Sequence, residues 1–269
     1  MQSIARLARG GCRRVAGFVA SGVAERGLLC RSAALALSVL LVAGAADAQF
    51  RRRVVIDDHT PPSGELVTSR WRYGTNGRIG HTGWSHNYPD AEVHLNEFVE
   101  RTTRIEVFYD SYRLVDLGSP EIFNYPFAYV SEPGEMEMTE AEVANMREYL
   151  ERGGFVLIDD FDGDHMDNLR EEMSRVFPDR RFERLDVTEP IFDLVFRVDD
   201  LQSMAPYVPG EDPVYYGLRN SAGDIVMVAC HNNDLANFWE WYGSPNYPLK
   251  PATDAFRMSA NFVIHAMTH

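Results

Sequence analysis

Four aspartates and a histidine end the segment GGFVLIDDFDGDH, residues 153–165, directly after an apolar stretch. Carboxylates this close together can hold a divalent cation or carry protons in acid–base chemistry. Counted from Asp160, carboxylates stand at positions 1, 3, 5 and 12, the spacing of an EF-hand calcium loop. They belong to Asp160, Asp162, Asp164 and Glu171. Position 6 is His165 instead of glycine, and a strand precedes the loop. One interpretation is a looser Ca²⁺ or Mg²⁺ site of Asp160, Asp162 and Asp164. We favour the other, in which one aspartate caps the next helix and the others are solvated, because the turn glycine of a calcium loop is missing.

A wider set of polar and aromatic residues could bind a ligand. Ligands of parallel sheets bind outside the carboxyl ends of the strands, so side chains that follow an apolar strand are the first candidates. The candidates are Asp159 and Asp160 after the strand 155–158, His231, Asn233 and Asp234 after the strand 225–230, and Trp84 as a stacking surface in a glycine-rich loop. These patterns assign a catalytic role to no residue.

Two further groups of side chains have both a functional and a structural interpretation. His81 and His86 stand five apart with Asp90 nearby, but no further ligand stands at a recognised zinc spacing. Ordinary loop packing is the simpler interpretation of this segment. Trp239, Trp241 and Tyr242 form an aromatic group that predicts either helix residues anchored in the core or a platform for a glycan or a partner.

The elements that must position these residues alternate between helix and strand. Strands are predicted at 105–109, 127–130, 155–158 and 225–230, with a hairpin turn at Asn220–Gly223 before the last. Helices are predicted after an N-cap at Asp90, after a capping box of Thr139 and Glu142, over 166–176, and over the C-terminal segment 253–269. This alternation is typical of an α/β doubly wound, mostly parallel sheet, here with a later antiparallel addition.

The N-terminal residues have the features of an export signal. Six arginines precede the apolar run SAALALSVLLVAGAA, and ADA precedes Gln49, which predicts cleavage after Ala48. An uncleaved membrane anchor is the alternative. We divide the chain into a signal peptide (1–48), a flexible linker (49–68) and one α/β domain (69–269). The protein is thus expected to be periplasmic or secreted, with no transmembrane segment in the mature chain.

Charge and cysteine content narrow the possible functions. The chain has 26 basic and 40 acidic residues, and the leader holds six arginines, one Glu and one Asp, so residues 49–269 carry 20 against 38, or −18. We therefore expect no binding of nucleic acid, because phosphates need a positive surface. Cys12 and Cys30 lie in the leader, which leaves Cys230 without a disulfide partner. Cys230 and His231 are neighbours on a strand and point to opposite faces, so we interpret Cys230 as a small core residue.

Several short motifs together resemble the bacterial domain-of-unknown-function family 4159. They are YP at Tyr88-Pro89, YPFAYV at 125–130, LERGGFVLIDDF at 150–161, VFPD at 176–179 and NND at 232–234. The resemblance extends from about Arg70 to the C-terminus. It implies a class I glutamine amidotransferase-like fold, which is a flavodoxin-like sheet, and it implies no established reaction. Amidotransferases need a cysteine on a strand-to-helix elbow, and no cysteine lies near Asp159 and Asp160.

Two functions from different classes are compatible with the sequence. The first is a non-catalytic binding or assembly module of the cell envelope, with an envelope protein or a small ligand as partner and without a required cofactor. The second is a Ca²⁺- or Mg²⁺-dependent hydrolase, with Asp159, Asp160 and Asp162 as ligands or bases and His165 or His231 as proton carrier. We favour the first, because the nucleophile of the related enzymes is missing.

Overall fold

The computed structural model describes residues 59–204, 206–245 and 247–268. The chain divides into two units, Met1–Val55 and Ile56–His269, and the described residues belong to the second. The predicted signal peptide and cleavage site therefore lie outside the described residues. No helix within the described residues is long and apolar enough to cross a membrane.

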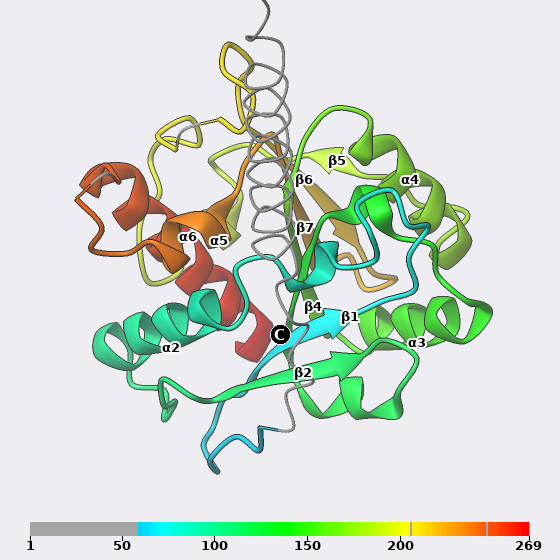
Figure 1. The fold of residues 1–269 in the computed structure, drawn as a ribbon, viewed down its shortest axis with the longest axis horizontal. Coiled ribbons are helices and arrows are strands. Elements are labelled where there is room, and N and C mark those ends of the chain that lie inside the picture. The colour runs from blue at the N-terminus through cyan, green and yellow to red at the C-terminus, as the bar shows by residue number, and fades with distance from the viewer. Residues whose placement is uncertain (1–58, 205, 246, 269) are drawn as a thin grey trace, which may run out of the picture. The chain divides into compact units, whose positions relative to one another are not determined.

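A seven-stranded sheet forms the centre of the domain (Figure 1). Its strands in spatial order are β2 (Tyr112–Asp116), β1 (Thr68–Arg72), β3 (Phe127–Ser131), β4 (Phe155–Phe161), β7 (Ile225–His231), β6 (Val214–Arg219) and β5 (Glu183–Arg184). The first five are parallel, whereas β6 and β5 are antiparallel to their neighbours. The prediction of a mostly parallel α/β sheet with an antiparallel addition is confirmed.

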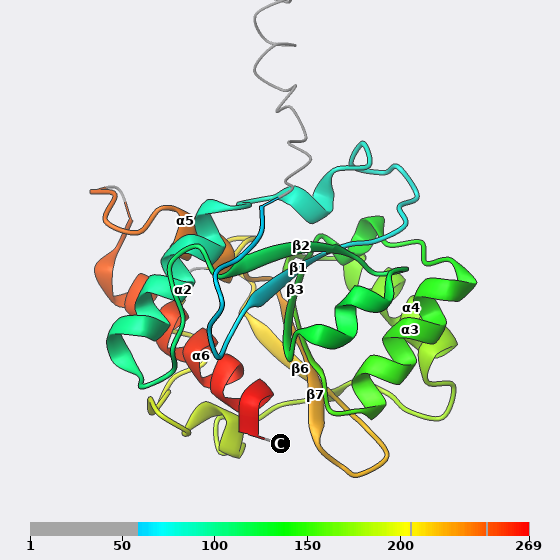
Figure 2. The same cartoon turned by 90° about the horizontal axis from the view of Figure 1, so that it is seen from below.

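Helices cover both faces of the sheet (Figures 1 and 2). One face carries α2 (Asp90–Thr102), α5 (Leu235–Glu240) and α6 (Leu249–Thr268), and the other carries α3 (Glu140–Glu151) and α4 (His165–Val176). Along β4, Phe155 and Leu157 join the core under the first group of helices, whereas Val156 and Ile158 join the core under the second. Because both faces are buried, this strand is apolar at every position up to Ile158.

The structure contains several of the predicted elements, with ends at or near the predicted residues. Thr139 and Glu142 form the complete capping box at the start of α3. The helix 166–176 is present as α4, and the C-terminal helix begins slightly earlier than predicted, at Leu249. The hairpin turn between β6 and β7 lies at Asn220–Gly223, where the Asn220 N–H donates to the carbonyl of Asp224 at 3.0 Å.

Three predictions about the first half of the domain are wrong. Residues 105–109 form no strand; the strand follows at β2, which is a partly exposed edge strand and so lacks the apolar pattern of the inner strands. Asp90 is the first residue of α2, and the N-cap position before it is held by Pro89. The described part of the linker is packed on the domain, because Leu66 is buried in the core and the Glu65 N–H donates to the Glu106 carbonyl at 2.8 Å.

Candidate functional site

The order of the strands marks one edge of the sheet as the place for a site. The chain leaves β1 through α2 on one face and leaves β3 through α3 on the opposite face. Where neighbouring parallel strands diverge in this way, their carboxyl ends border a crevice, and ligands of open α/β sheets bind there. The segments after β1, β3 and β4 meet at this point.

Strained backbone is concentrated at the same edge. Five described residues other than glycine have a positive φ, namely His81, Asn87, Glu132, Asp160 and Asn232, with φ between 53° and 66°. The first two lie in the segment between β1 and α2, and the others lie at the carboxyl ends of β3, β4 and β7. Such residues cost about 1–3 kcal/mol each and cluster at functional sites. The backbone therefore marks the edge independently of the side-chain chemistry.

Three side chains from three different segments converge there. His86 Nδ1 lies 3.0 Å from Asp160 Oδ2 and 3.3 Å from Glu132 Oε1. One donor atom from each residue lies within 4.8 Å of the other two, and no other such group of three is present among the described residues. Ligand atoms bound at about 2.1 Å to one ion stand about 3.0–3.5 Å apart. The spacing therefore suits a shared divalent cation as well as an ion pair.

The protonation state of His86 decides whether the three side chains bind a cation or form an ion pair. The hydrogen bonds that His86 donates to Asp160 and to Glu132 raise the pKa of His86 to about 10, so the imidazole is charged when no metal is bound. His165 Nδ1 lies 3.4 Å from the second oxygen of Glu132. Burial alone would raise the pKa of Glu132, but its hydrogen bonds to His165 and His86 lower it. Glu132 is thus an ionised carboxylate between two histidines.

A buried arginine fixes the loop that carries His86. Arg70 is fully buried in β1, and its Nε donates to Glu92 Oε1 at 2.6 Å. Its Nη1 donates to the carbonyl oxygens of Trp84 at 3.1 Å and His86 at 2.8 Å. The guanidinium also lies 4.1 Å from the centre of the Tyr129 ring. The backbone at His86 is therefore held in place by the sheet.

A buried carboxylate fixes the preceding part of the same loop. Glu135 is fully buried and accepts hydrogen bonds from the N–H groups of Ile79 at 3.2 Å, His81 at 2.5 Å and Gly83 at 2.8 Å. A Cβ at Gly83 would lie 2.7 Å from the Cβ of Glu132, so this close approach requires glycine. Arg70 donates hydrogen bonds to the carbonyl oxygens of the loop, and Glu135 accepts hydrogen bonds from its N–H groups. Together the two side chains preorganise the loop.

Asp159 is completely buried and does not belong to the group of His86, Glu132 and Asp160, which is called the metal-type group from here on. Its Oδ2 accepts hydrogen bonds from Tyr129 Oη and from the Ala236 N–H, both at 3.0 Å. Its Oδ1 has no hydrogen-bond partner among the described residues. Burial raises the pKa of Asp159 to about 7, against the lowering effect of the Ala236 N–H. Asp159 therefore ties β4 to the start of α5.

Within the described residues, Asp160, Asp162 and Asp164 do not form the cluster considered as a Ca²⁺ or Mg²⁺ site. Asp160 lies within a bulge of β4, where the register with β7 shifts, and its side chain meets His86 and Glu132. Asp162 is only half-buried and lies outside this group. Asp164 is exposed and pairs with Arg78 at 3.1 Å; it occupies the N-cap position of α4 but makes no capping hydrogen bond. The bulge separates the three side chains.

The other predicted ligand-binding residues have different surroundings. Trp84 is buried in the core, at 4% exposure, and so offers no stacking surface. Asn233 is buried, and its amide donates to Tyr215 Oη at 2.6 Å. His231 packs against the ring of Phe161 at 5.6 Å, outside the metal-type group. Asp234 caps α5 through the Asn237 N–H at 2.8 Å and also lines a hollow.

The structure also shows the surroundings of two zinc candidates, His81 and Asp90, and of the Cys230 thiol. His81 lies next to Thr75, with Nδ1 2.5 Å from Oγ1, and neither it nor Asp90 belongs to the metal-type group. Cys230 is fully buried, and burial raises the pKa of its thiol well above the usual value. A thiolate nucleophile at this position is therefore disfavoured.

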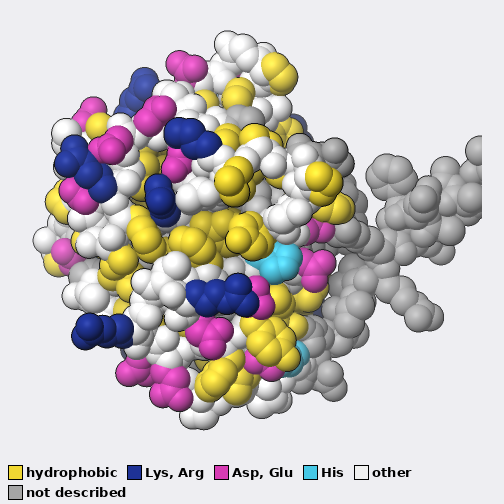
Figure 3. Space-filling view, turned by 90° about the vertical axis from the view of Figure 1, so that its left-hand side faces the viewer, with side chains coloured by type: hydrophobic (Ala, Val, Ile, Leu, Met, Phe, Trp, Pro, Cys, Tyr) yellow, Lys and Arg dark blue, Asp and Glu magenta, His cyan; other side chains and the backbone are white. Residues whose placement is uncertain are grey.

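The second aromatic group divides between core and surface. Trp239 is buried at 1% exposure and packs edge-on against Tyr129 at 5.6 Å. Trp241 and Tyr242 follow α5 and are 47% and 55% exposed. Hydrophobic side chains gather in a broad band on the side of the molecule that carries α2, α5 and α6 (Figure 3). Trp239 is therefore a core anchor, whereas a platform at Trp241 and Tyr242 stays a prediction.

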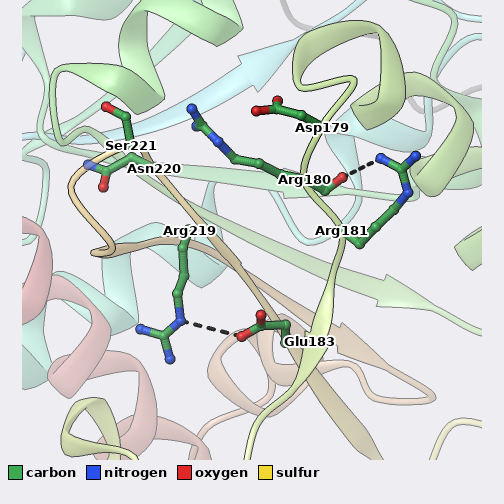
Figure 4. A pocket seen from close by; sticks show the side chains of 7 residues that line it. All are labelled: Asp179, Arg180, Arg181, Glu183, Arg219, Asn220 and Ser221. Atoms are coloured by element: carbon green, nitrogen blue, oxygen red, sulfur yellow. Dashed lines mark hydrogen bonds and ion pairs between the residues drawn. The ribbon is translucent and has the colours of Figure 1, made fainter.

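A hollow lies at the opposite end of β7, and most of the positive charge in its wall is neutralised. It has a volume of about 610 Å³ and is lined by Asp179, Glu183, Asn220, Ser221 and three arginines (Figure 4). Arg180 pairs with Glu151 at 2.6 Å, Arg219 with Glu183 at 3.5 Å, and Arg181 donates to two backbone carbonyls. Acidic partners neutralise two of the three cations, so this hollow is no strong anion site.

Sequence reasoning missed the centre of the site. Glu132 and Arg70 were not candidates, and His86 was considered only with His81 and Asp90. The signal for Glu132 was present: it directly follows the apolar strand FAYVS and precedes Pro133-Gly134, as a residue at a strand end should. No sequence pattern distinguishes Arg70 from a surface arginine, because its burial depends on Glu92 in another element.

Two comparisons bear on the identity of the chain. The sequence model of a family described as "Domain of unknown function (DUF4159)" matches residues 70–267. A search of curated proteins finds no match.

Proposed function

The chain belongs to the DUF4159 family, and we propose that its domain is a metal-dependent binding module of the cell envelope. The observation that carries the proposal is the group of His86, Glu132 and Asp160, whose donor atoms lie within 4.8 Å of one another. One imidazole nitrogen and two carboxylates favour Zn²⁺ or Mn²⁺ over Ca²⁺ and Mg²⁺, because nitrogen is a poor ligand for the harder ions. The preorganised loop from Arg70 and Glu135 supports the same conclusion.

The fold and the compartment belong to this proposal. We infer a flavodoxin-like, class I glutamine amidotransferase-like fold, since the order β2-β1-β3-β4-β7 of the parallel strands equals the order 2-1-3-4-5 of flavodoxin-like sheets. The buried Cys230 supports a role without amidotransferase chemistry. Export through the leader 1–48 follows from its sequence, and N-terminal sequencing of the mature protein is expected to begin at Gln49.

Calorimetric titration of chelator-treated protein tests the metal site. Zn²⁺ or Mn²⁺ should bind with one ion per chain, and at a hundredfold excess over Kd should stabilise the fold by about 2.7 kcal/mol. Asp160→Asn should abolish binding while the backbone is kept, because asparagine tolerates a positive φ. Asp164→Asn is the matched control and should bind like wild type. Equal binding by both variants would place the ion elsewhere.

Metal-dependent hydrolysis is the second candidate. His86 is 42% exposed in its side chain, so an ion held there by three protein ligands would keep coordination positions open to solvent. Three protein ligands with an open position are the pattern of catalytic zinc sites. Turnover of nitrophenyl esters or phosphates by the metal-loaded protein, lost in Asp160→Asn, would favour the hydrolase over the binding module.

A further inference from the structure

A second cavity lies beside the carboxyl end of β7. It has a volume of about 460 Å³ and is lined by Tyr207, Asp234, Asn237, Phe238, Tyr247 and two prolines. Its size is within the range of small-molecule sites. None of the residues that line it has been assigned to the metal-type group.

Aromatic rings form much of the wall. The rings of Phe238 and Tyr247 pack edge-on with centres 5.8 Å apart, and Trp241 stacks on Tyr247 at 6.4 Å. Tyr207 is 50% exposed, so part of its ring is free to meet a ligand. The faces of such rings carry negative charge density and attract cations.

The charged group in the wall is the carboxylate of Asp234. Its Oδ1 accepts the Asn237 N–H at 2.8 Å, and no lysine or arginine is among the described residues that line the cavity. Burial, together with the nearby carboxylates of Asp160 and Asp159, raises the pKa of Asp234. A cationic ligand in the cavity would supply a countercharge and so favour the ionised carboxylate.

The segment that carries Tyr207 is fixed to the edge of the sheet. The Tyr207 N–H donates to the carbonyl of Asn232 at 3.2 Å, and the Val208 N–H donates to Asn232 Oδ1 at 2.7 Å. Burial and the carboxylates of Asp160, Glu132, Asp234 and Asp162 raise the pKa of Tyr207 to about 12. A negative field therefore extends from the strand ends to this cavity.

We propose that the cavity binds a primary ammonium group on an alkyl chain, with its charge against Asp234 and its carbon atoms against the aromatic rings. The group could belong to a small amine or to a lysine side chain, since both present the same chemistry. The inference deepens the proposed binding function by naming the class of ligand, and it uses residues other than the metal-type ligands.

Titration of the full protein with n-butylamine and with N-acetyl-lysinamide tests the proposal, with n-butanol as the neutral analogue. At least one amine should bind saturably, and about tenfold or more tighter than butanol, because only the amine pairs with Asp234. If butylamine binds and the lysine derivative does not, the ligand is a small amine; binding of the lysine derivative points to a peptide. Binding of butanol as tight as that of the amines, or no binding of either amine, would overturn the proposal.

Asp234→Asn is the decisive variant, because asparagine is also a good N-cap and should keep α5 folded. It should weaken amine binding about tenfold and leave butanol unchanged. Asp224→Asn, at an exposed aspartate before β7, is the matched control and should bind amines like wild type. Unchanged amine affinity in Asp234→Asn would refute the role of the carboxylate.

The metal proposal can fail independently of this one. Asp234→Asn should keep the metal affinity of wild type, whereas His86→Ala should lose metal and keep amine binding. Loss of amine binding alone in the first variant and of metal binding alone in the second would support two separate subsites. If neither metal nor His86→Ala has any effect while amines still bind, only the proposed metal function is wrong.

Discussion

The buried pair of Arg70 and Glu92 predicts a large effect from a small substitution. Glu92→Gln keeps the shape of the side chain but removes the charge that faces the guanidinium. The side chains of Arg70 and Glu92 are 0% and 4% exposed. Arg70 Nη2 and Glu92 Oε2 have no hydrogen-bond partner among the described residues. The other partners of the guanidinium are neutral carbonyl and hydroxyl oxygens, so its charge is balanced chiefly by Glu92. Removing one partner of such a pair costs about 3–5 kcal/mol.

The same strand offers a matched control. Arg72 pairs with Asp116 two positions further along β1, with side chains that are 38% and 54% exposed. Exposed pairs contribute about 0.2–1 kcal/mol, so Asp116→Asn should change little. In urea unfolding with a slope of about 2 kcal/mol/M, Glu92→Gln should lower the midpoint by about 1.5–2.5 M and Asp116→Asn by about 0.5 M or less.

One result would refute this reasoning. Burial raises the pKa of Glu92, while the charge of Arg70 lowers it. If Glu92 were protonated in the folded protein, glutamine would replace it at almost no cost. Equal midpoints for Glu92→Gln and Asp116→Asn would therefore show that the buried pair is not ionic.

Three further predictions concern the site and its surroundings. Cys230→Ala should cost about 1 kcal/mol in thermal unfolding, because the residue is fully buried, and should leave metal and amine binding intact; loss of binding in a folded variant would restore a role for the thiol. Gly134→Ala should displace the ring of His165, because a Cβ at this position would clash with that ring, and should lower metal affinity with little change in secondary structure seen by circular dichroism. The pKa of His86 is raised to about 10, chiefly by Asp160, so its pairing should stabilise the metal-free fold fully below pH 6.5 and lose that contribution as the pH rises to about 10. His86→Gln should flatten this part of a melting-temperature profile against pH, and an unchanged slope would contradict the pairing.

The sequence predicts the inner part of the fold better than the site. Apolar runs and capping residues predict β3, β4, β7, α3 and α4, because the apolar residues of these elements are the ones that the fold buries. The edge strand β2 and the first strand β1 are less apolar and were missed. Their existence depends on pairing across the sheet, between Thr68 and Tyr112 for example, which no local pattern contains.

The site depends on contacts between residues that lie far apart in the sequence. Asp160 was a candidate because it follows a strand, and the structure places it there. Its true neighbours, His86 and Glu132, come from segments 74 and 28 residues away. A bulge in β4 and left-handed backbone at Glu132 and Asp160 turn these side chains together. The EF-hand spacing suggested Asp162 and Asp164 as neighbours of Asp160 instead, because no local sequence pattern predicts the bulge.

The left-handed residues at the strand ends affect which substitutions can raise the thermal stability of this protein. At Glu132 and Asp160 glycine would adopt the backbone conformation without a steric penalty, so either residue gives up about 1 kcal/mol or more to keep its side chain. Near neutral pH the pairing of both carboxylates with His86 offsets this backbone cost, and the offset is lost as the pH rises to about 10. A selection for heat resistance should therefore drift toward glycine at these positions only in alkaline conditions, and near neutral pH thermostable variants of this domain are better sought in the exposed turns than at the edge of the sheet.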